Sequence, residues 1–184
     1  MTTLQTPRLP SDLAACATKV ATVRAAMPAD TDAVAKVLAK SYRALLAPDY
    51  DPELLRQSLP LISQANPRLL SCGTYFVVEE DDRILACGGW TDTSPHGAAG
   101  RHGVGHIRHV AVDPMVARKG YGTLLMARIF ESARATQVTD LRCQSTLTAA
   151  PFYAAAGFGS LGRIDVRLPT GLLFPAVQMR RLDG

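Results

Sequence analysis

The chain has 184 residues, of which 47% are hydrophobic, 20% charged and 6% aromatic. This length allows one domain with a substantial core, and the composition excludes a disordered chain, a collagen-like repeat and a coiled coil. The formal net charge of +4 suits an anionic ligand or nucleic acid without choosing between them. No apolar run approaches the roughly 18 residues of a membrane span, and the first twenty residues do not resemble a secretory signal. The four cysteines form no C-x-x-C pair, which is typical of a reduced, cytoplasmic protein.

The domain organisation is expected to be simple. Residues 1–19 contain prolines and polar residues without a sustained hydrophobic period, which predicts a flexible N-terminal arm. Residues 20–184 then form a single domain, because no internal repeat or low-complexity tract divides them.

Two helices are predicted in the first part of this domain. The first is expected to start at Asp30 or Thr31, since a short side-chain oxygen accepts a hydrogen bond from the exposed amides of a first turn. Pro48 ends this helix, and Pro52, at a first-turn position, starts a second helix that reaches about residue 62. The predicted buried face of the first helix consists of Val34, Val37, Leu38, Ser41, Tyr42 and Leu45.

After these helices the hydrophobic period becomes that of strands. Runs at 74–80 and 83–91 flank Asp81-Asp82 and predict a hairpin, and the glycine- and histidine-containing stretch at 94–105 predicts a long loop. One face of residues 120–135 is apolar or small, which predicts a helix. Further strands are expected at 21–24, 106–112, 140–146, 158–168 and 174–180, with a short helix at 149–156. The order indicates a mixed α/β fold with a strand–helix–strand crossover in its middle.

The turn between the strand at 106–112 and the helix at 120–135 has the character of an anion site. A helix start leaves about four amides unpaired and carries a partial positive charge of ~0.5 units. Gly120 and Gly122 let those amides converge on an anion, and Arg118 and Lys119 add two full charges. The Gly-Lys-Ser/Thr ending of a Walker loop is missing, and a single G-x-G is not a dinucleotide fingerprint. The alternative is that both glycines only allow close packing of the helix on the sheet.

Two separated motifs resemble those of the GNAT N-acetyltransferase superfamily. Residues 110–125 are similar to motif A, Q/R-x-x-G-x-G/A, with Gly120 and Gly122 on its glycines; Ala117 stands at the Q/R position and Arg118 follows one step later. Residues 148–158, TAAPFYAAAGF, resemble the family element A-x-x-F-Y-x-x-x-G-F.

This resemblance implies a fold and a cosubstrate. The fold is a central, mostly antiparallel twisted sheet with a parallel, splayed strand pair, flanked by about four helices. The cosubstrate is acetyl-CoA, whose pantetheine arm pairs with the backbone of Val110, Ala111 and Val112. A frequent family asparagine is Thr146 here, which leaves one hydrogen bond to the cosubstrate open. A homodimer is plausible through the closing strands. The main-chain amides that would hold the pyrophosphate are those of Arg118, Lys119, Gly120, Tyr121, Gly122 and Thr123.

Transfer to an amine needs a base for the amine and an acid for the leaving thiol. His106 is the first choice of base because histidine titrates near ~6.5, and a family branch carries a histidine there. The alternatives are an exposed strand-edge His106 with no role, His109 as the base, or a water relay. Strand alternation places His109 on the face opposite His106 unless a bulge intervenes. Tyr153 matches the family tyrosine and is the expected acid, because its pKa of ~10 keeps it protonated; the alternative is a tyrosine that only packs in the core.

Other polar residues suggest less. Histidines 96, 102, 106 and 109 lie close in sequence, but without an acidic or cysteine ligand they do not predict a metal site. Asp49, Asp51 and Glu53 would attract a cationic amine or merely form a solvated helix start, and the second reading is favoured. Trp90 and Cys143 are expected in the core.

With this resemblance, we expect an N-acetyltransferase that moves the acetyl group of acetyl-CoA to a primary amine of a small molecule or protein, by direct attack in a ternary complex. Of these partners a small-molecule amine is favoured, and neither nucleic acid nor a membrane is expected. The alternative is a non-catalytic acyl-CoA-binding regulatory module.

Overall fold

The computed structural model describes residues 20–95, 97 and 99–183, so the N-terminal arm expected at 1–19 lies outside the described residues. The strands are β1 (Thr22–Ala25), β2 (Tyr75–Glu80), β3 (Arg83–Thr91), β4 (Val104–Val112), β5 (Asp140–Thr146), β6 (Gly159–Arg167) and β7 (Leu173–Leu182). The helices are α1 (Thr31–Leu45), α2 (Pro52–Ile62), α3 (Pro67–Leu70), α4 (Tyr121–Ala135) and α5 (Ala150–Ala155), with two 3-10 turns at Pro28–Asp30 and Pro114–Val116. None of the helices in this part of the chain has both the length and the apolar character of a membrane span.

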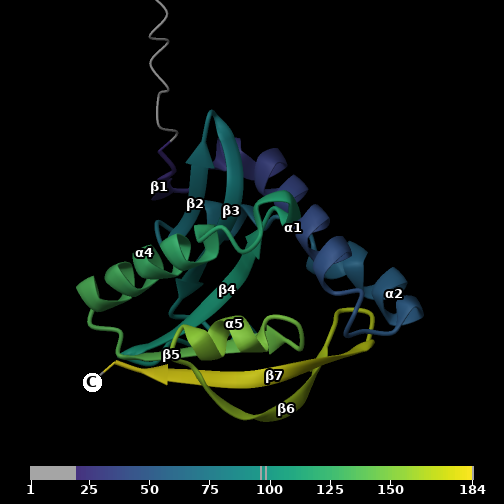
Figure 1. The fold of residues 1–184 in the computed structure, drawn as a ribbon. Helices are drawn as coiled ribbons and strands as arrows, with labels where there is room; N and C mark the ends of the chain where they lie inside the picture. The colour runs from purple at the N-terminus through teal and green to yellow at the C-terminus, as the bar shows by residue number, and fades with distance from the viewer. Residues whose placement is uncertain (1–19, 96, 98, 184) are drawn as a thin grey trace, which may run out of the picture.

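The seven strands form one sheet in the order β1-β2-β3-β4-β5-β7-β6. All neighbours are antiparallel except β4 and β5, which are parallel and joined through α4. Helix α1 packs on β3 and β4 from one face, and α4 packs on β2 and β3 from the other (Figure 1). The predicted mixed α/β fold, with a mostly antiparallel sheet and one parallel pair, is confirmed.

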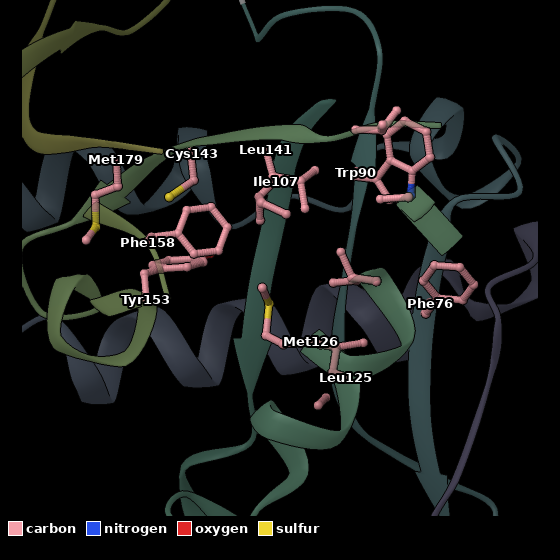
Figure 2. Packing of buried hydrophobic residues seen from close by; sticks show 14 of the residues in the cluster. Phe76, Trp90, Ile107, Leu125, Met126, Leu141, Cys143, Tyr153, Phe158 and Met179 are labelled. Carbon is pink, nitrogen blue, oxygen red and sulfur yellow. The ribbon is translucent and has the colours of Figure 1, made fainter. Parts of the chain in front are cut away.

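The core on the α4 side includes buried residues of β2, β3, β4, β5 and β7. Figure 2 shows Tyr153, Phe158 and Cys143 gathered at one end of this core and Trp90 at the other. Trp90 is 5% exposed and its indole N–H donates to the Ser132 hydroxyl at 3.1 Å, while Cys143 is 4% exposed. Both residues are therefore core residues, as expected.

Local sequence explains α2 well. The carboxylate of Asp51 accepts hydrogen bonds from the amides of Glu53 and Leu54, and Pro52 occupies the first helical position, where a missing N–H costs nothing. The predicted bounds of α2 agree with the structure. Helix α1 also begins as predicted, but Asp30 does not cap it with its side chain; its carboxylate instead binds the Arg24 guanidinium at 2.7 Å.

The structure differs from expectation in a few elements. Strand β4 begins at Val104, two residues inside the stretch predicted as loop, because Val104 and Gly105 pair with β5. The additional one-turn helix α3, capped by Asn66, brings the number of described α-helices to five instead of about four. The first strand lies one residue later than predicted.

Candidate active site

Strands β4 and β5 separate soon after they meet. Their parallel pairing covers only Val104–His106 of β4 and Asp140–Arg142 of β5. Strand β4 continues for six more residues, which is about 20 Å at ~3.3 Å per residue, and Figure 1 shows the two strands diverging beyond the point where they meet. This confirms the expected splay. It leaves one edge of β4 available to an extended ligand that carries amide groups.

A bulge interrupts β4 at His109. Arg108 pairs with Gly89 and Ala111 with Cys87, so one residue of β3 faces both His109 and Val110, and His109 has a φ of 46°. The alternation of side chains shifts there, so the placement of His109 opposite His106, which assumed no bulge, does not apply. Burial and then the charge of Arg108 lower the pKa of His109 to about 4. A base with that pKa is weak at neutral pH.

The start of α4 has the form expected of an anion site. Gly120 is the N-cap residue with a φ of 92°, and no side chain caps the helix. The Leu124 amide donates to the Gly120 carbonyl at 2.9 Å, and before the helix the Lys119 amide donates to the Val116 carbonyl at 3.3 Å. Arg118, with a φ of 68°, and Lys119 are exposed beside this end. The end therefore offers main-chain donors and two cations to one ligand.

The two glycines of the turn serve different purposes. A Cβ on Gly120 would meet no atom within 4 Å, so Gly120 is required by its left-handed backbone. A Cβ on Gly122 would lie 3.1 Å from the ring of Phe152, so Gly122 is required by the packing of α4 on α5. The alternative that the glycines only allow close packing therefore applies to Gly122. Gly120 is instead explained by the backbone conformation at the start of α4.

His106 stands at the vertex of the splay. It is the last residue of β4 paired with β5, it is half-buried, and it lines a pocket of about 300 Å³. Burial lowers its pKa, and the charges of Arg142 and Arg108 lower it further, against weaker opposing effects of Asp140 and Asp92. His106 is therefore neutral at pH 7 and able to accept a proton.

Tyr153 is placed by α5 on the other side of the splay. Its ring is 6% exposed and meets the rings of Phe152 and Phe158 edge-on, each at 5.4 Å between centroids. Burial, and then the proximity of Cys143 and Tyr42, raises its pKa well above the ordinary value. Within the described residues its hydroxyl makes no hydrogen bond, so the proton remains available. The ring is a core ring, as the alternative expected, and the hydroxyl is still a possible donor.

Two other predicted residues already have side-chain partners. The Thr146 hydroxyl accepts a hydrogen bond from the Ala149 amide at 3.2 Å and so stabilises the start of α5. The Tyr121 hydroxyl donates to the Glu80 carboxylate at 3.1 Å. The main chain of Tyr121, rather than its hydroxyl, is what the predicted site would use.

The acidic residues before and at the start of α2 already have hydrogen-bond or ion-pair partners. Asp49 accepts from the Thr148 hydroxyl at 2.7 Å, Asp51 caps α2, and Glu53 pairs with Arg56. This agrees with the favoured reading of a solvated helix start. In the stretches that the structure describes, no three histidine, cysteine or acidic side chains come together as metal ligands, and His96 lies outside these stretches.

Sequence reasoning missed a cluster beside His106. Arg142 and Arg180 both bind the carboxylate of Asp140, at 2.7 and 2.8 Å. Arg142 and Asp140 are two residues apart on a strand and therefore share a face, which was a readable signal. Arg180 joins them only through the pairing of β5 with β7, which the sequence alone does not show.

Known proteins share this architecture. Residues 71–159 match the family model described as an acetyltransferase (GNAT) domain. The fold is similar to that of a GCN5-related N-acetyltransferase from Rhodopseudomonas palustris, at 18% identity over 88% of this chain and 95% of that chain, with a TM-score of 0.71. It is also similar to a PaiA N-acetyltransferase from Thermoplasma acidophilum in complex with coenzyme A, at 11% identity over 89% and 99% of the two chains, with a TM-score of 0.66.

A third similar structure is N-acetylglutamate synthase from Neisseria gonorrhoeae, complexed with coenzyme A and N-acetylglutamate. The identity is 20% over 90% of this chain and 36% of that chain, with a TM-score of 0.58. Comparison with curated proteins finds no match. At these identities the solved structures support the fold alone.

The matched family model and the similar folds support an acyltransferase. The match of residues 71–159 to the acetyltransferase (GNAT) domain agrees with the resemblance drawn from the two motifs.

Proposed function

We propose that the protein is an acetyl-CoA-dependent N-acetyltransferase that acetylates a primary amine of a small molecule by direct attack in a ternary complex. Membership of the GNAT family supports acyl-CoA-dependent transfer in general. The observation that carries the more specific proposal is the separation of β4 from β5 beyond His106, next to a helix start capped only by Gly120.

The chain's residues fit acetyl-CoA. The amides of residues 118–123, with the charges of Arg118 and Lys119, would hold the pyrophosphate. The backbone of residues 110–112 would pair with the pantetheine amides in the splay. An apolar groove of about 400 Å³ between α4 and α5, whose lining includes Thr123, Phe152 and Arg181, would take a further part of the same ligand. Two of the similar solved structures contain coenzyme A.

Two side chains would move protons. Bound acetyl-CoA would supply a thioester carbonyl for the amine to attack. An amine with a pKa of ~10.4 is uncharged in only about one molecule in 10³ at pH 7, so His106, neutral at that pH, would take its proton. Tyr153, whose raised pKa keeps its hydroxyl protonated, would donate to the leaving sulfur.

A non-catalytic acyl-CoA-binding module is the second candidate. Two features favour it: Ala117 occupies a position where the family motif has Gln or Arg, and the Thr146 hydroxyl is already bound to the start of α5.

We also propose that two copies of the chain would pair through the outer strand β6. This strand ends the sheet, and its Leu161 is 63% exposed.

Binding and turnover measured separately would test the proposal. Calorimetry of the full chain with coenzyme A should detect a complex, and thiol release from acetyl-CoA should depend on an added primary amine. No complex with coenzyme A would contradict the proposal altogether. A complex without turnover across a panel of amines would favour the binding module.

A further inference from the structure

We infer that the acetyl acceptor carries an anionic group on the same molecule as its amine, and that Arg142 and Arg180 bind this group in the pocket beside His106. The inference rests on the proposed function and names the substrate class of that site.

The pocket lies on the sheet face opposite α4. Leu141, Cys143 and Met179 belong to the core under α4, so the residues that alternate with them on β5 and β7 project from the other face. Its volume of about 300 Å³ is at the lower end of the ~300–1,000 Å³ typical of small-molecule sites, which favours a small acceptor. The lining residues are Ser94, Pro95, His106, Arg142, Cys143, Gln144, Leu161, Gln178 and Arg180.

The cationic residues in this lining are Arg142 and Arg180, and none of the lining residues that the structure describes is acidic. Asp140 is the counter-ion of both arginines. Each arginine uses its Nε and Nη2 atoms for Asp140, so Nη1 of each guanidinium stays outside this clamp. One carboxylate cannot neutralise two guanidinium groups, so the pair keeps a net positive charge.

Asp140 stays ionised near neutral pH, so the net positive charge of this cluster does not change there. Burial opposes its ionisation, but the hydrogen bonds from Arg180 and Arg142 outweigh burial and lower the pKa of Asp140 to about 2. Arg108 adds charge nearby, since it lowers the pKa of His106, and among the described residues it has no carboxylate partner. The pocket is therefore cationic beside the predicted base.

The chemistry of this charge selects the acceptor. Guanidinium groups bind carboxylates and phosphates through paired, charge-assisted hydrogen bonds. Asp49, Asp51 and Glu53, the carboxylates that would attract a purely cationic amine, are not among the residues that line this pocket. The structure thus favours an amine with a carboxylate or a phosphate over an amine whose only charge is positive.

Matched pairs of amines would test the inference. The three pairs are L-phenylalanine with phenethylamine, 4-aminobutyrate with butylamine, and O-phosphoethanolamine with ethanolamine. In the pair used best, kcat/KM of the member with the anionic group should exceed that of its partner without one by about 10-fold, the effect of one charge-assisted hydrogen bond. The first two pairs report a carboxylate and the third a phosphate.

Variants would assign the effect to the arginines. Arg142→Gln and Arg180→Gln should each reduce the preference for the anionic member to about 3-fold or less. They should also weaken calorimetric binding of that amine to the protein saturated with coenzyme A. Gln144→Glu adds a negative charge to the lining while leaving the Asp140 clamp intact, so it should reduce the preference even if an arginine variant folds poorly. The matched control is Arg83→Gln, at an exposed arginine outside the pocket.

The outcomes separate the two claims. If coenzyme A binds and the amines without an anionic group are acetylated as well as their partners that carry one, the acceptor inference is overturned and the proposed function stands. A preference that survives in both arginine variants and in Gln144→Glu also overturns it. If the wild-type protein does not bind coenzyme A, both claims fall.

Discussion

The hydroxyl of Tyr50 accepts a hydrogen bond from the amide of Leu147 at 2.7 Å, and it donates one to the Pro175 carbonyl at 2.8 Å. The Tyr50 ring also stacks on Phe174 at 4.6 Å between centroids. One side chain between α1 and α2 therefore connects the turn after β5 with β7. Since this turn leads directly into α5, Tyr50 helps to fix the helix that carries Tyr153.

Replacing Tyr50 with phenylalanine should lower the free energy of unfolding by about 1–3 kcal/mol, because two main-chain groups lose their partner while the ring contact stays. Urea unfolding measures this. Thr148→Ala removes the accessible hydrogen bond to Asp49 in the same region and should cost clearly less. An unchanged midpoint for Tyr50→Phe would show that water replaces the hydroxyl at no cost.

Gly120→Ala should weaken coenzyme A binding by at least about 10-fold, because the side chain disfavours the left-handed start of α4 by roughly 1–2 kcal/mol and displaces its amides. Calorimetry with coenzyme A gives the affinity. Gly171→Ala is the matched control, since Gly171 also has a positive φ, 85°, and open space around its Cα, but lies between β6 and β7. Equal losses of affinity in both variants would mean that stability, not the site, is affected.

The pH dependence of turnover should identify His106. Because its pKa is lowered, the neutral form persists below pH 6.5, so kcat/KM should fall only when the pH drops below that value. In His106→Gln this acidic limb should disappear and kcat should fall by about 10²-fold. His102→Gln, at an exposed histidine of the preceding segment, should retain both. An acidic limb that persists unchanged in His106→Gln would assign the base to another group.

Tyr153→Phe should lower kcat by about 10²-fold with little effect on the affinity for coenzyme A, because only the donated proton is lost and the ring packing is kept. Single-turnover kinetics and calorimetry separate these two quantities. The raised pKa also predicts that the wild-type rate does not fall through loss of this proton between pH 7 and 10. Unchanged turnover in Tyr153→Phe would remove Tyr153 from the mechanism.

Elements with strong local signals were predictable from sequence. The capping residue Asp51 and the following Pro52 determine where α2 starts. The adjacent aspartates 81 and 82 determine the position of the hairpin between β2 and β3. Both aspartates have positive φ values, 50° and 56°, as such a turn requires. Helix α3 was missed because a four-residue helix is too short to show a hydrophobic period, although Asn66 and Pro67 mark its start.

Features that depend on pairing between distant strands were not predictable. The bulge at His109 could not be predicted, because a histidine in a strand does not indicate a bulge. The bulge is visible only from the register of β3 against β4. The clamp on Asp140 likewise depends on Arg180 of β7, whose register no local pattern fixes. The placement of His106 near the start of β4 and of Tyr153 in α5 follows from signals within single elements, and the catalytic role of each stays a prediction.

The extra residue in β4 also determines which side chains the arm beyond it presents to each layer. Ile107 and Val110 both reach the core under α4, although strict alternation would put residues three apart on opposite faces. Loss of a single codon at position 109 would place Val110 two residues after Ile107, so Val110 and Val112 would still face the core under α4 and Ala111 the opposite layer. For this strand, removal of the extra residue therefore keeps the inward-facing side chains inward, and it removes only the local bend that the bulge introduces.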